Sequence, residues 1–190
     1  MARPKLFDRD EALQAAIRAF RNTGFAGTST DDLLNAMGIS RQSLYDTFGD
    51  KRALYLEALR QYNADSLSRS LRALHAAPSP REGLEALLME FVSRATENGH
   101  CLGVSSIGEF GRGDDDICAL NDTSGHVLTT AIRQAVEAGH ASGQIPKSVS
   151  PKATAVFILT LLSGLKVLAR GGASQNDLRD AVRVGLNSLG

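Results

Sequence analysis

Three polar residues with the chemistry to read DNA bases stand in succession in the first third of the chain, Arg41, Gln42 and Ser43. An arginine side chain can pair with guanine, and a glutamine side chain with adenine, each through two hydrogen bonds in the major groove. Tyr45 and Thr47 follow, with hydroxyl groups suited to a phosphate or to a nearby thymine methyl. Contacts of this kind need a helix that presents these residues to the base edges.

The surrounding residues predict such a helix. One short helix opens after Ser29, a second is capped by Ser40, and the turn between them contains Gly38. Leu44 and Phe48 lie four residues apart, on the face that turns inward. The second helix of a helix-turn-helix lies in the major groove with its N-terminal residues at the bases. The segment over about residues 29–48 is therefore predicted to bind DNA.

The charges near this segment are balanced. Residues 1–62 hold nine Lys or Arg and eight Asp or Glu, and the whole chain has a net charge of zero. Lys51 stands in the first turn of the next predicted helix, where free amides and a cation together suit a phosphate. Asp46 is unfavourable beside phosphates, although it can accept from a cytosine amine. By spacing alone, a helical hairpin inside a larger bundle stays an alternative.

The chain as a whole is predicted to be all-α. It has no runs of alternating Val, Ile and Thr and no Asn-Gly or Asp-Gly hairpin signals. Further helices are expected over about 8–23, 51–74, 80–97, 114–139, 151–169 and 174–189, with one short helix within 99–113. Aromatic residues are concentrated in the first 62 residues, which favours two modules with different cores.

Residues 25–51 resemble the DNA-binding domain of the TetR family of bacterial repressors. The matching features lie within about residues 7–55 and are Gly24-Phe25, Thr28-Ser29, Ala36-Met37-Gly38-Ile39-Ser40, Leu44-Tyr45, Phe48, Lys51 and Leu54. The resemblance implies a three-helix DNA-binding domain over 1–50 and a helical ligand-binding and dimerisation domain over 51–190. It implies a ligand-responsive repressor, without catalytic residues or a cofactor.

The same resemblance implies which residues contact DNA. Ser29 and Thr30 would contact phosphate at the start of the first short helix, and Lys51 would contact the backbone. The residues expected to face the groove are Arg41, Gln42, Ser43, Tyr45 and Thr47. The family often has an aromatic or basic residue where this chain has Asp46, and a histidine where it has Thr47, so the roles of both positions stay open.

A homodimer is expected on two grounds. One helix-turn-helix contacts few base pairs, so such proteins bind inverted repeats as two-fold dimers, with recognition helices about 34–36 Å apart. The apolar segment 151–169 also has more hydrophobic surface than one face can bury. With residues 176–189 it is predicted to form a four-helix interface, as in the repressors it resembles. A core helix of a monomer is the alternative.

In the family a ligand enters a pocket among the middle helices and changes the spacing of the DNA-reading heads. An effector acts in this way only if it binds the two states with different affinity. The candidate lining residues, each of which also suits ordinary packing, are Met89, Phe91, Cys101, Ile107, Phe110, Val127, Phe157 and Leu161. None of them identifies the effector.

Cys101 has a second interpretation. A thiol at a helix start beside His100 is expected to have a lowered pKa, and residues 100–104 are similar to those of family members that respond to electrophiles or oxidants. The chain is then a redox- or electrophile-sensing repressor. A cysteine in such a place is also often a small hydrophobic residue.

Other functions find little support in the sequence. His100, Cys101, Cys118 and His126 match no metal-ligand spacing, and no nucleophile or phosphate-binding motif is present. The sequence predicts a cytoplasmic protein without a membrane role. It has only two cysteines, its N-terminus shows no secretory signal, and it contains no apolar stretch near 18 residues. An alternative of another class is a helical protein-interaction module that does not bind DNA.

Overall fold

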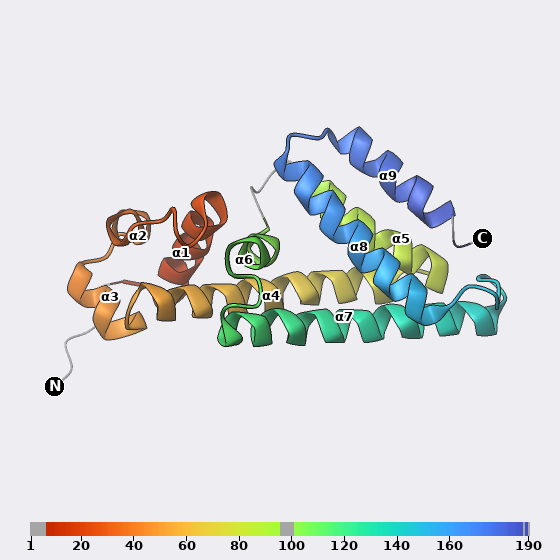
Figure 1. The fold of residues 1–190 in the computed structure, drawn as a ribbon, viewed down its shortest axis with the longest axis horizontal. Coiled ribbons are helices and arrows are strands. Elements are labelled where there is room, and N and C mark those ends of the chain that lie inside the picture. Colours follow the sequence, from red (N-terminus) through yellow and green to blue (C-terminus); the bar gives the residue numbers. More distant parts are fainter. Residues whose placement is uncertain (1–6, 96–100, 188, 190) are drawn as a thin grey trace. The chain divides into compact units, whose positions relative to one another are not determined.

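A computed structural model of the chain describes residues 7–95, 101–187 and 189. Over these residues the chain forms nine helices and no strand, so the all-α prediction is confirmed (Figure 1). The helices are α1 (Arg9–Thr23), α2 (Thr30–Met37), α3 (Arg41–Phe48), α4 (Lys51–Ala76), α5 (Pro80–Arg94), α6 (Leu102–Phe110), α7 (Asp115–Ser142), α8 (Pro151–Arg170) and α9 (Gln175–Asn187).

The helix starts follow polar caps that the sequence indicated. Asp8 accepts the first free N–H groups of α1 from Asp10 and Glu11. The side chains of Ser79 and Ser150 accept an N–H from the third residue of α5 and of α8, and a proline opens each of these helices. A capped N-terminus with proline at the first position satisfies the donors that a helix leaves unpaired.

The chain divides into two compact units. Unit 1 comprises residues up to 63 together with 101–120, and therefore contains α1 to α3, the first half of α4, α6 and the start of α7. Its core includes Phe20, Leu33, Leu44 and Tyr55, all fully buried. The ring of Tyr55 meets that of Phe20 edge-on, with the centroids 4.9 Å apart.

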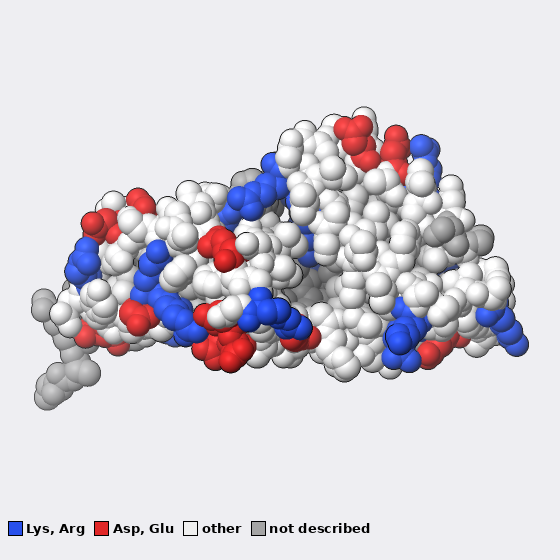
Figure 2. All heavy atoms as spheres, viewed as in Figure 1, with Lys and Arg blue, Asp and Glu red and all other residues white. Residues whose placement is uncertain are grey.

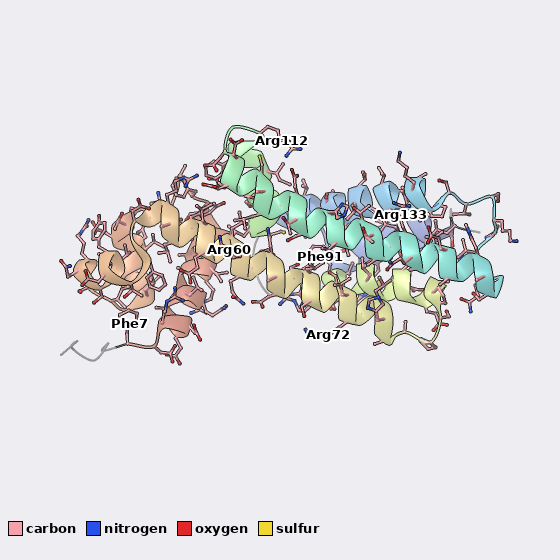
Figure 3. The ribbon with its side chains drawn as sticks, turned by 90° about the horizontal axis from the view of Figure 1, so that it is seen from below. Phe7, Arg60, Arg72, Phe91, Arg112 and Arg133 are labelled. Atoms are coloured by element: carbon pink, nitrogen blue, oxygen red, sulfur yellow. The ribbon has the colours of Figure 1, made fainter. Side chains whose placement is uncertain are left out.

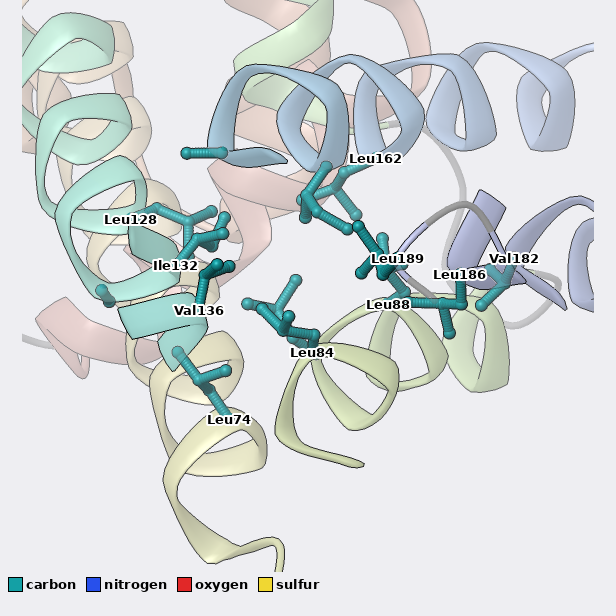
Figure 4. Close-up of a cluster of buried hydrophobic side chains, with 14 of the residues drawn as sticks. Leu74, Leu84, Leu88, Leu128, Ile132, Val136, Leu162, Val182, Leu186 and Leu189 are labelled. Carbon is teal, nitrogen blue, oxygen red and sulfur yellow. The ribbon is translucent and has the colours of Figure 1, made fainter. Parts of the chain in front are cut away.

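Unit 2 comprises residues 64–100 and 121–190, and its described part holds α5, α8, α9 and the remainder of α4 and α7. Figure 4 shows its core, where Leu84 and Leu88 of α5 face Ile132 of α7, Leu162 of α8 and Val182 of α9. Both α5 and α8 pack against α9. Aliphatic side chains from five helices thus close a single core.

The compact units do not coincide with a division of the chain at residue 50. Residues 101–120 belong to unit 1 because Leu102 of α6 and Ile117 of α7 are buried in the core formed by α1 to α4. A compact unit is not by itself a functional domain. The assignment of DNA binding to 1–50 and of ligand binding and dimerisation to 51–190 therefore stays a prediction.

Helix α8 covers the predicted apolar segment 151–169 and ends one residue later, at Arg170. At 20 residues it could cross a membrane by length and composition alone, which is weak ground for a membrane role. One face, with Ala155, Ile158 and Leu162, is buried within unit 2. On the other face Val156 and Leu168 are exposed, at 58% and 53%. Packing in the core of unit 2 therefore accounts for one face of α8 and not for its exposed apolar residues.

Candidate nucleic-acid interface

Helices α2 and α3 form the predicted helix-turn-helix within unit 1. Gly38 ends α2 in the left-handed conformation, with φ +65°, and its N–H donates to the carbonyl of Leu34. Ser40 then caps α3, because its hydroxyl accepts the N–H of Ser43 at 3.1 Å. Glycine reaches a positive φ without the strain that a Cβ imposes. The turn is therefore built from residues that the sequence already placed there.

The burial of α3 divides it into two faces. Leu44 and Phe48 are buried and hold the helix on unit 1. Ser43 and Thr47 flank them and are half-buried. The fully outward side chains are Arg41, Gln42, Tyr45 and Asp46, with Tyr45 49% exposed. Four side chains of α3 therefore point outward, and Ser43 and Thr47 lie at the margin of that face.

The start of α2 is an internally bonded cap. The N–H and the hydroxyl of Ser29 both donate to Asp32 Oδ2, at 2.9 and 2.6 Å, and the N–H of Asp32 donates back to Ser29 Oγ at 3.1 Å. The Ser29 hydroxyl, more than its N–H, holds the pKa of Asp32 below its ordinary value. Thr30 beside it is half-buried. A phosphate at this helix start would therefore meet donors already bonded to Asp32.

Two acidic side chains hold the candidate base-reading residues. Arg41 Nη2 forms an ion pair with Asp31 Oδ1 of α2 at 2.5 Å. Gln42 Nε2 donates to Asp46 Oδ1, one turn further along α3, at 2.8 Å. Both pairs are exposed, so water and salt screen the charges. Arg41 and Gln42 are thus oriented before DNA is present.

Lys51 lies at the first position of α4, whose start is capped by Asp50 through the N–H of Ala53 at 2.7 Å. Its Nζ sits 4.3 Å from the centroid of the Phe25 ring, in the range of a cation–π contact. Phe25 precedes α2, so this contact joins α4 to the segment that leads into the helix-turn-helix. The position combines a cation with a helix N-terminus, as a phosphate contact requires.

A second set of contacts in unit 1 was not predicted from the sequence. Glu109 of α6 accepts the N–H of Phe25 at 2.9 Å and that of Ala26 at 3.2 Å, in the loop between α1 and α2. Arg52 of α4 pairs with Asp114 and Asp116 at the start of α7, each at 2.9 Å. These contacts fix the loop and the helix that flank α2 and α3.

The ion pairs also act on protonation. The Arg52 guanidinium, with help from the N–H of Ile117, holds the pKa of Asp114 below its ordinary value. Hydrogen bonds to Asp114 and Asp116 raise the pKa of Arg52. Each partner stabilises the charged form of the other, so the contact holds over the whole neutral range.

The charge around α2 and α3 is acidic rather than basic. Residues 29–51 hold two basic side chains, Arg41 and Lys51, against four acidic ones. On the face shown in Figure 2, basic and acidic side chains alternate over unit 1 without a single basic patch. Electrostatic attraction to phosphate scales with the number of contacts made by Lys and Arg. Within residues 29–51 only Arg41 and Lys51 can therefore contribute such an attraction.

Three of the candidate ligand-binding residues belong to unit 1. Cys101 is the N-cap residue of α6 and is half-buried, while His100 lies outside the described residues. Phe110 packs against the rings of Phe25 and Tyr55, with centroids 5.5 and 5.7 Å away, as part of the core. Ile107 is 57% exposed. Phe110 thus has a packing role in unit 1.

The other five candidates belong to unit 2. Met89, Phe91 and Leu161 are half-buried and pack against its core; Figure 3 shows Phe91 on α5. Val127 and Phe157 are partly exposed, at 39% and 38%. Met89 also lines an open cavity of about 410 Å³ between α5 and α9, whose other lining residues include Arg81 and Arg183. The other four candidates of unit 2 do not line this cavity, and the role of all five in ligand binding stays a prediction.

The described residues show no group of three or more His, Cys, Asp or Glu that could hold a metal ion. Neither Cys101 nor Cys118 forms a disulfide in the described part of the chain, and Cys118 Sγ donates to the carbonyl of Gly111 at 3.5 Å. The two cysteines therefore have separate surroundings in this structure, one at the start of α6 and one in the first turn of α7.

Known proteins share both the sequence and the fold. A family model described as bacterial regulatory proteins, tetR family, matches residues 12–58. The uncharacterised HTH-type transcriptional regulator YezE of Bacillus subtilis is 41% identical over 93 residues, and the match spans about half of each protein, 49% of this chain and 48% of YezE. The HTH-type transcriptional repressor ComR of Escherichia coli is 27% identical over 93% of this chain and 86% of its own length.

The similarity in structure extends over the whole chain. The TetR family transcriptional regulator CifR, solved as a cysteine-substituted variant bound to 26-base-pair operator DNA, is 32% identical. It superposes with a TM-score of 0.89 and covers 100% of both chains. NemR of E. coli in its reduced form is 21% identical, with a TM-score of 0.83, and shares the fold. The match to CifR includes the helix-turn-helix and all helices that follow it.

Proposed function

Because the chain belongs to the TetR family of DNA-binding transcriptional repressors, we propose that it reads an inverted-repeat operator through the outward face of α3. It is a regulator rather than an enzyme, and its partners are double-stranded DNA and a second copy of itself. The observation that carries the proposal is the exposure of Arg41 and Gln42 at the start of a helix held on unit 1 by Leu44 and Phe48. That is the position from which a recognition helix contacts bases.

The assignment of individual contacts follows from the geometry. Arg41 and Gln42 are assigned to base edges, and Tyr45 to a phosphate or a thymine methyl. Ser43 and Thr47, half-buried at the margin of the same face, are assigned to the groove wall. Arg41 must release Asp31 before all the N–H donors of its guanidinium can reach guanine. Because this ion pair is lost, Arg41 contributes less to DNA affinity than an unpaired arginine would.

Phosphate contacts are assigned to both flanks of α3. Ser29 and Thr30 stand at the start of α2, and Lys51 stands at the start of α4. Lys51 is the strongest of the three, because it adds a full charge to the free amides of a helix N-terminus. A phosphate at Ser29 would compete with Asp32 for the N–H and hydroxyl donors of Ser29, so this contact is expected to be the weakest.

For the dimer we assign the interface to α8 and α9. On α8 the outward residues include the apolar Val156 and Leu168, 58% and 53% exposed, and on α9 Val184 is 70% exposed among outward residues that are otherwise polar or charged. The two helices lie very close together at Gly185, where a Cβ would meet the side chains of Leu161 and Phe157. An exposed apolar face on α8, with polar residues of α9 beside it, suits the core and the rim of a four-helix interface between two copies.

The response to an effector is assigned to the candidate ligand-binding residues. Of the candidates, Met89 lines a cavity, and Cys101 stands at a helix start. Where a ligand or an oxidant acts, it must bind or modify one of two states preferentially. We place the protein in the cytoplasm, because its operator is there.

The test is DNA affinity as a function of salt. The full chain and two variants, Lys51→Ala and the control Lys147→Ala, are titrated against a duplex containing the operator at several salt concentrations. Lys147 is exposed and belongs to unit 2, whereas the helix-turn-helix belongs to unit 1. Loss of one phosphate contact lowers the slope of log K against log salt by about 0.9. Lys51→Ala is expected to show this change and Lys147→Ala is not. Identical slopes for all three proteins would refute the contact.

A further inference from the structure

A hydrogen bond on the outward face of α3 fixes which end of the Gln42 amide points away from the helix. Gln42 Nε2 donates to Asp46 Oδ1 at 2.8 Å, and both side chains are exposed. An aspartate carboxylate only accepts hydrogen bonds, so it must face the amide NH2 and not the amide oxygen. Without such a partner a glutamine amide turns freely about its last torsion and presents either end.

The position of Asp46 calls for a reason, because a negative charge beside phosphates weakens DNA binding. Four acidic residues lie between 29 and 51, and two of them are caps: Asp32 at the start of α2 and Asp50 at the start of α4. Asp46 lies in the second turn of α3 and caps no helix start. Its contact is with Gln42, a residue already assigned to a base edge.

The orientation of the amide decides which bases Gln42 can pair with. With its NH2 turned toward Asp46, Gln42 presents Oε1 as an acceptor and keeps its second N–H as a donor. Adenine offers the matching donor N6 and acceptor N7 in the major groove, whereas guanine offers the two acceptors N7 and O6. An amide turned by 180° would suit guanine, but it would set its oxygen against the Asp46 carboxylate.

We propose that Asp46 is a positioning residue that makes Gln42 select adenine over guanine in the operator. It acts through the Gln42 amide and does not itself touch a base. The inference rests on the proposed function, since it needs α3 to lie in the major groove. Asp46 then contributes to specificity through Gln42. The role that the sequence indicated for Asp46, a direct contact with a cytosine amine, is the alternative.

The experiment compares five proteins that each carry the whole chain: the natural sequence, Asp46→Ala, Asp46→Asn, Gln42→Ala and the double variant of Asp46→Ala with Gln42→Ala. Operators are selected from a random duplex pool with the natural protein. The base pair under Gln42 is the one whose preference Gln42→Ala relaxes. Dissociation constants are then measured for duplexes with adenine or guanine at that position. The readout is the ratio of the two constants, because removing a charge near phosphate changes affinity for all sequences alike.

For the natural protein the ratio is expected to favour adenine by roughly fivefold or more, the discrimination of one good paired contact. Asp46→Ala is expected to reduce the ratio to within about twofold while leaving the preferences at other base pairs intact. In the Gln42→Ala background the same change is expected to have no effect on the ratio. Asp46→Asn, which keeps the shape and permits both amide orientations, is expected to reduce the ratio as well.

Two results would overturn the inference while leaving the proposed function standing. One is a ratio that Asp46→Ala leaves unchanged. The other is an equal change in the ratio in the Gln42→Ala background, which would mean that Asp46 contacts the base directly. Failure of the proposed function looks different: the natural protein enriches no sequence, or Gln42→Ala alters no base preference. That outcome overturns both.

Discussion

Gly24 ends α1 and lies against the Glu109 side chain of α6. Replacing Gly24 with alanine is expected to destabilise unit 1. Gly24 has φ +76° and ψ −176°, a region essentially restricted to glycine. A Cβ at this position would also overlap Oε1 of Glu109. The same carboxylate accepts the N–H groups of Phe25 and Ala26 in the loop that leads to α2.

The expected magnitude has two parts. An alanine forced into this region of φ and ψ costs about 1–3 kcal/mol. The Glu109 carboxylate is flexible and can move aside, but it then loses its hydrogen bonds to the loop. Hydrogen bonds to a charged acceptor contribute about 1.5–3 kcal/mol when buried, and the exposure of Glu109 reduces this to about 1 kcal/mol. We expect Gly24→Ala to lower the free energy of unfolding by about 3 kcal/mol.

The assay is denaturant unfolding at one fixed protomer concentration, because dimerisation contributes to stability. Gly38→Ala is the matched control: Gly38 has φ +65° with open space around it, so the change should cost only about 1–2 kcal/mol. In a Glu109→Ala background, Gly24→Ala should cost about 1 kcal/mol less than in the natural protein. The reasoning is refuted if Gly24→Ala costs no more than Gly38→Ala, or if the two changes at 24 and 109 are additive.

Four further outcomes are expected. Tyr55→Phe should leave stability unchanged or raise it by about 1 kcal/mol in thermal unfolding, because the buried Tyr55 hydroxyl has no hydrogen-bond partner among the described residues; a clear loss would contradict this. Arg52→Ala should lower the Tm at neutral pH. The folded pKa of Asp114 lies below its ordinary 3.8, so the stabilisation by the Arg52–Asp114 ion pair is present above this pH and is lost as the pH falls through the folded pKa. The Tm values of the natural protein and of Arg52→Ala, plotted against pH, should therefore converge under acid conditions. Asp31→Asn should raise affinity for operator DNA in an anisotropy titration, because it frees the arginine that Asp31 holds and removes a negative charge; lower affinity would argue against that restraint. Val156→Asp should shift sedimentation from dimer to monomer with the helical circular dichroism retained, and a persistent dimer would exclude this face of α8.

Much of the fold was predictable because its signals are local. Ser29, Gly38, Ser40 and Pro80 each act within a few residues of their own position, and the structure places helix ends at all of them. The segment 29–48 could therefore be identified as a helix-turn-helix before any tertiary contact was known. The division of α3 into buried and exposed faces also followed from the spacing of its apolar residues.

The contacts that restrain the candidate site were not predictable, because they depend on tertiary placement. Arg52 and Asp114 are 62 residues apart, and Glu109 reaches Phe25 across 84 residues. The inclusion of residues 101–120 in unit 1 depends on the same placement. The pairing of Gln42 with Asp46 is different: the two residues are one turn apart, a spacing at which side chains meet on a helix. The spacing of Gln42 and Asp46 thus predicts that they can pair, but it does not show whether Asp46 faces Gln42 or a base.

The most direct test of the central claim is selection of bound sequences from a random duplex pool by the full chain and by Arg41→Ala, at near-physiological salt. The natural protein is expected to enrich an inverted repeat whose half-sites lie about one helical turn, or a multiple of it, apart. Arg41→Ala is expected to keep the symmetry and relax the preference for guanine at one position in each half-site. Two results would contradict the reading of DNA through α3. In one, the natural protein enriches no symmetric sequence; in the other, both proteins enrich the same sequence with the same base preferences.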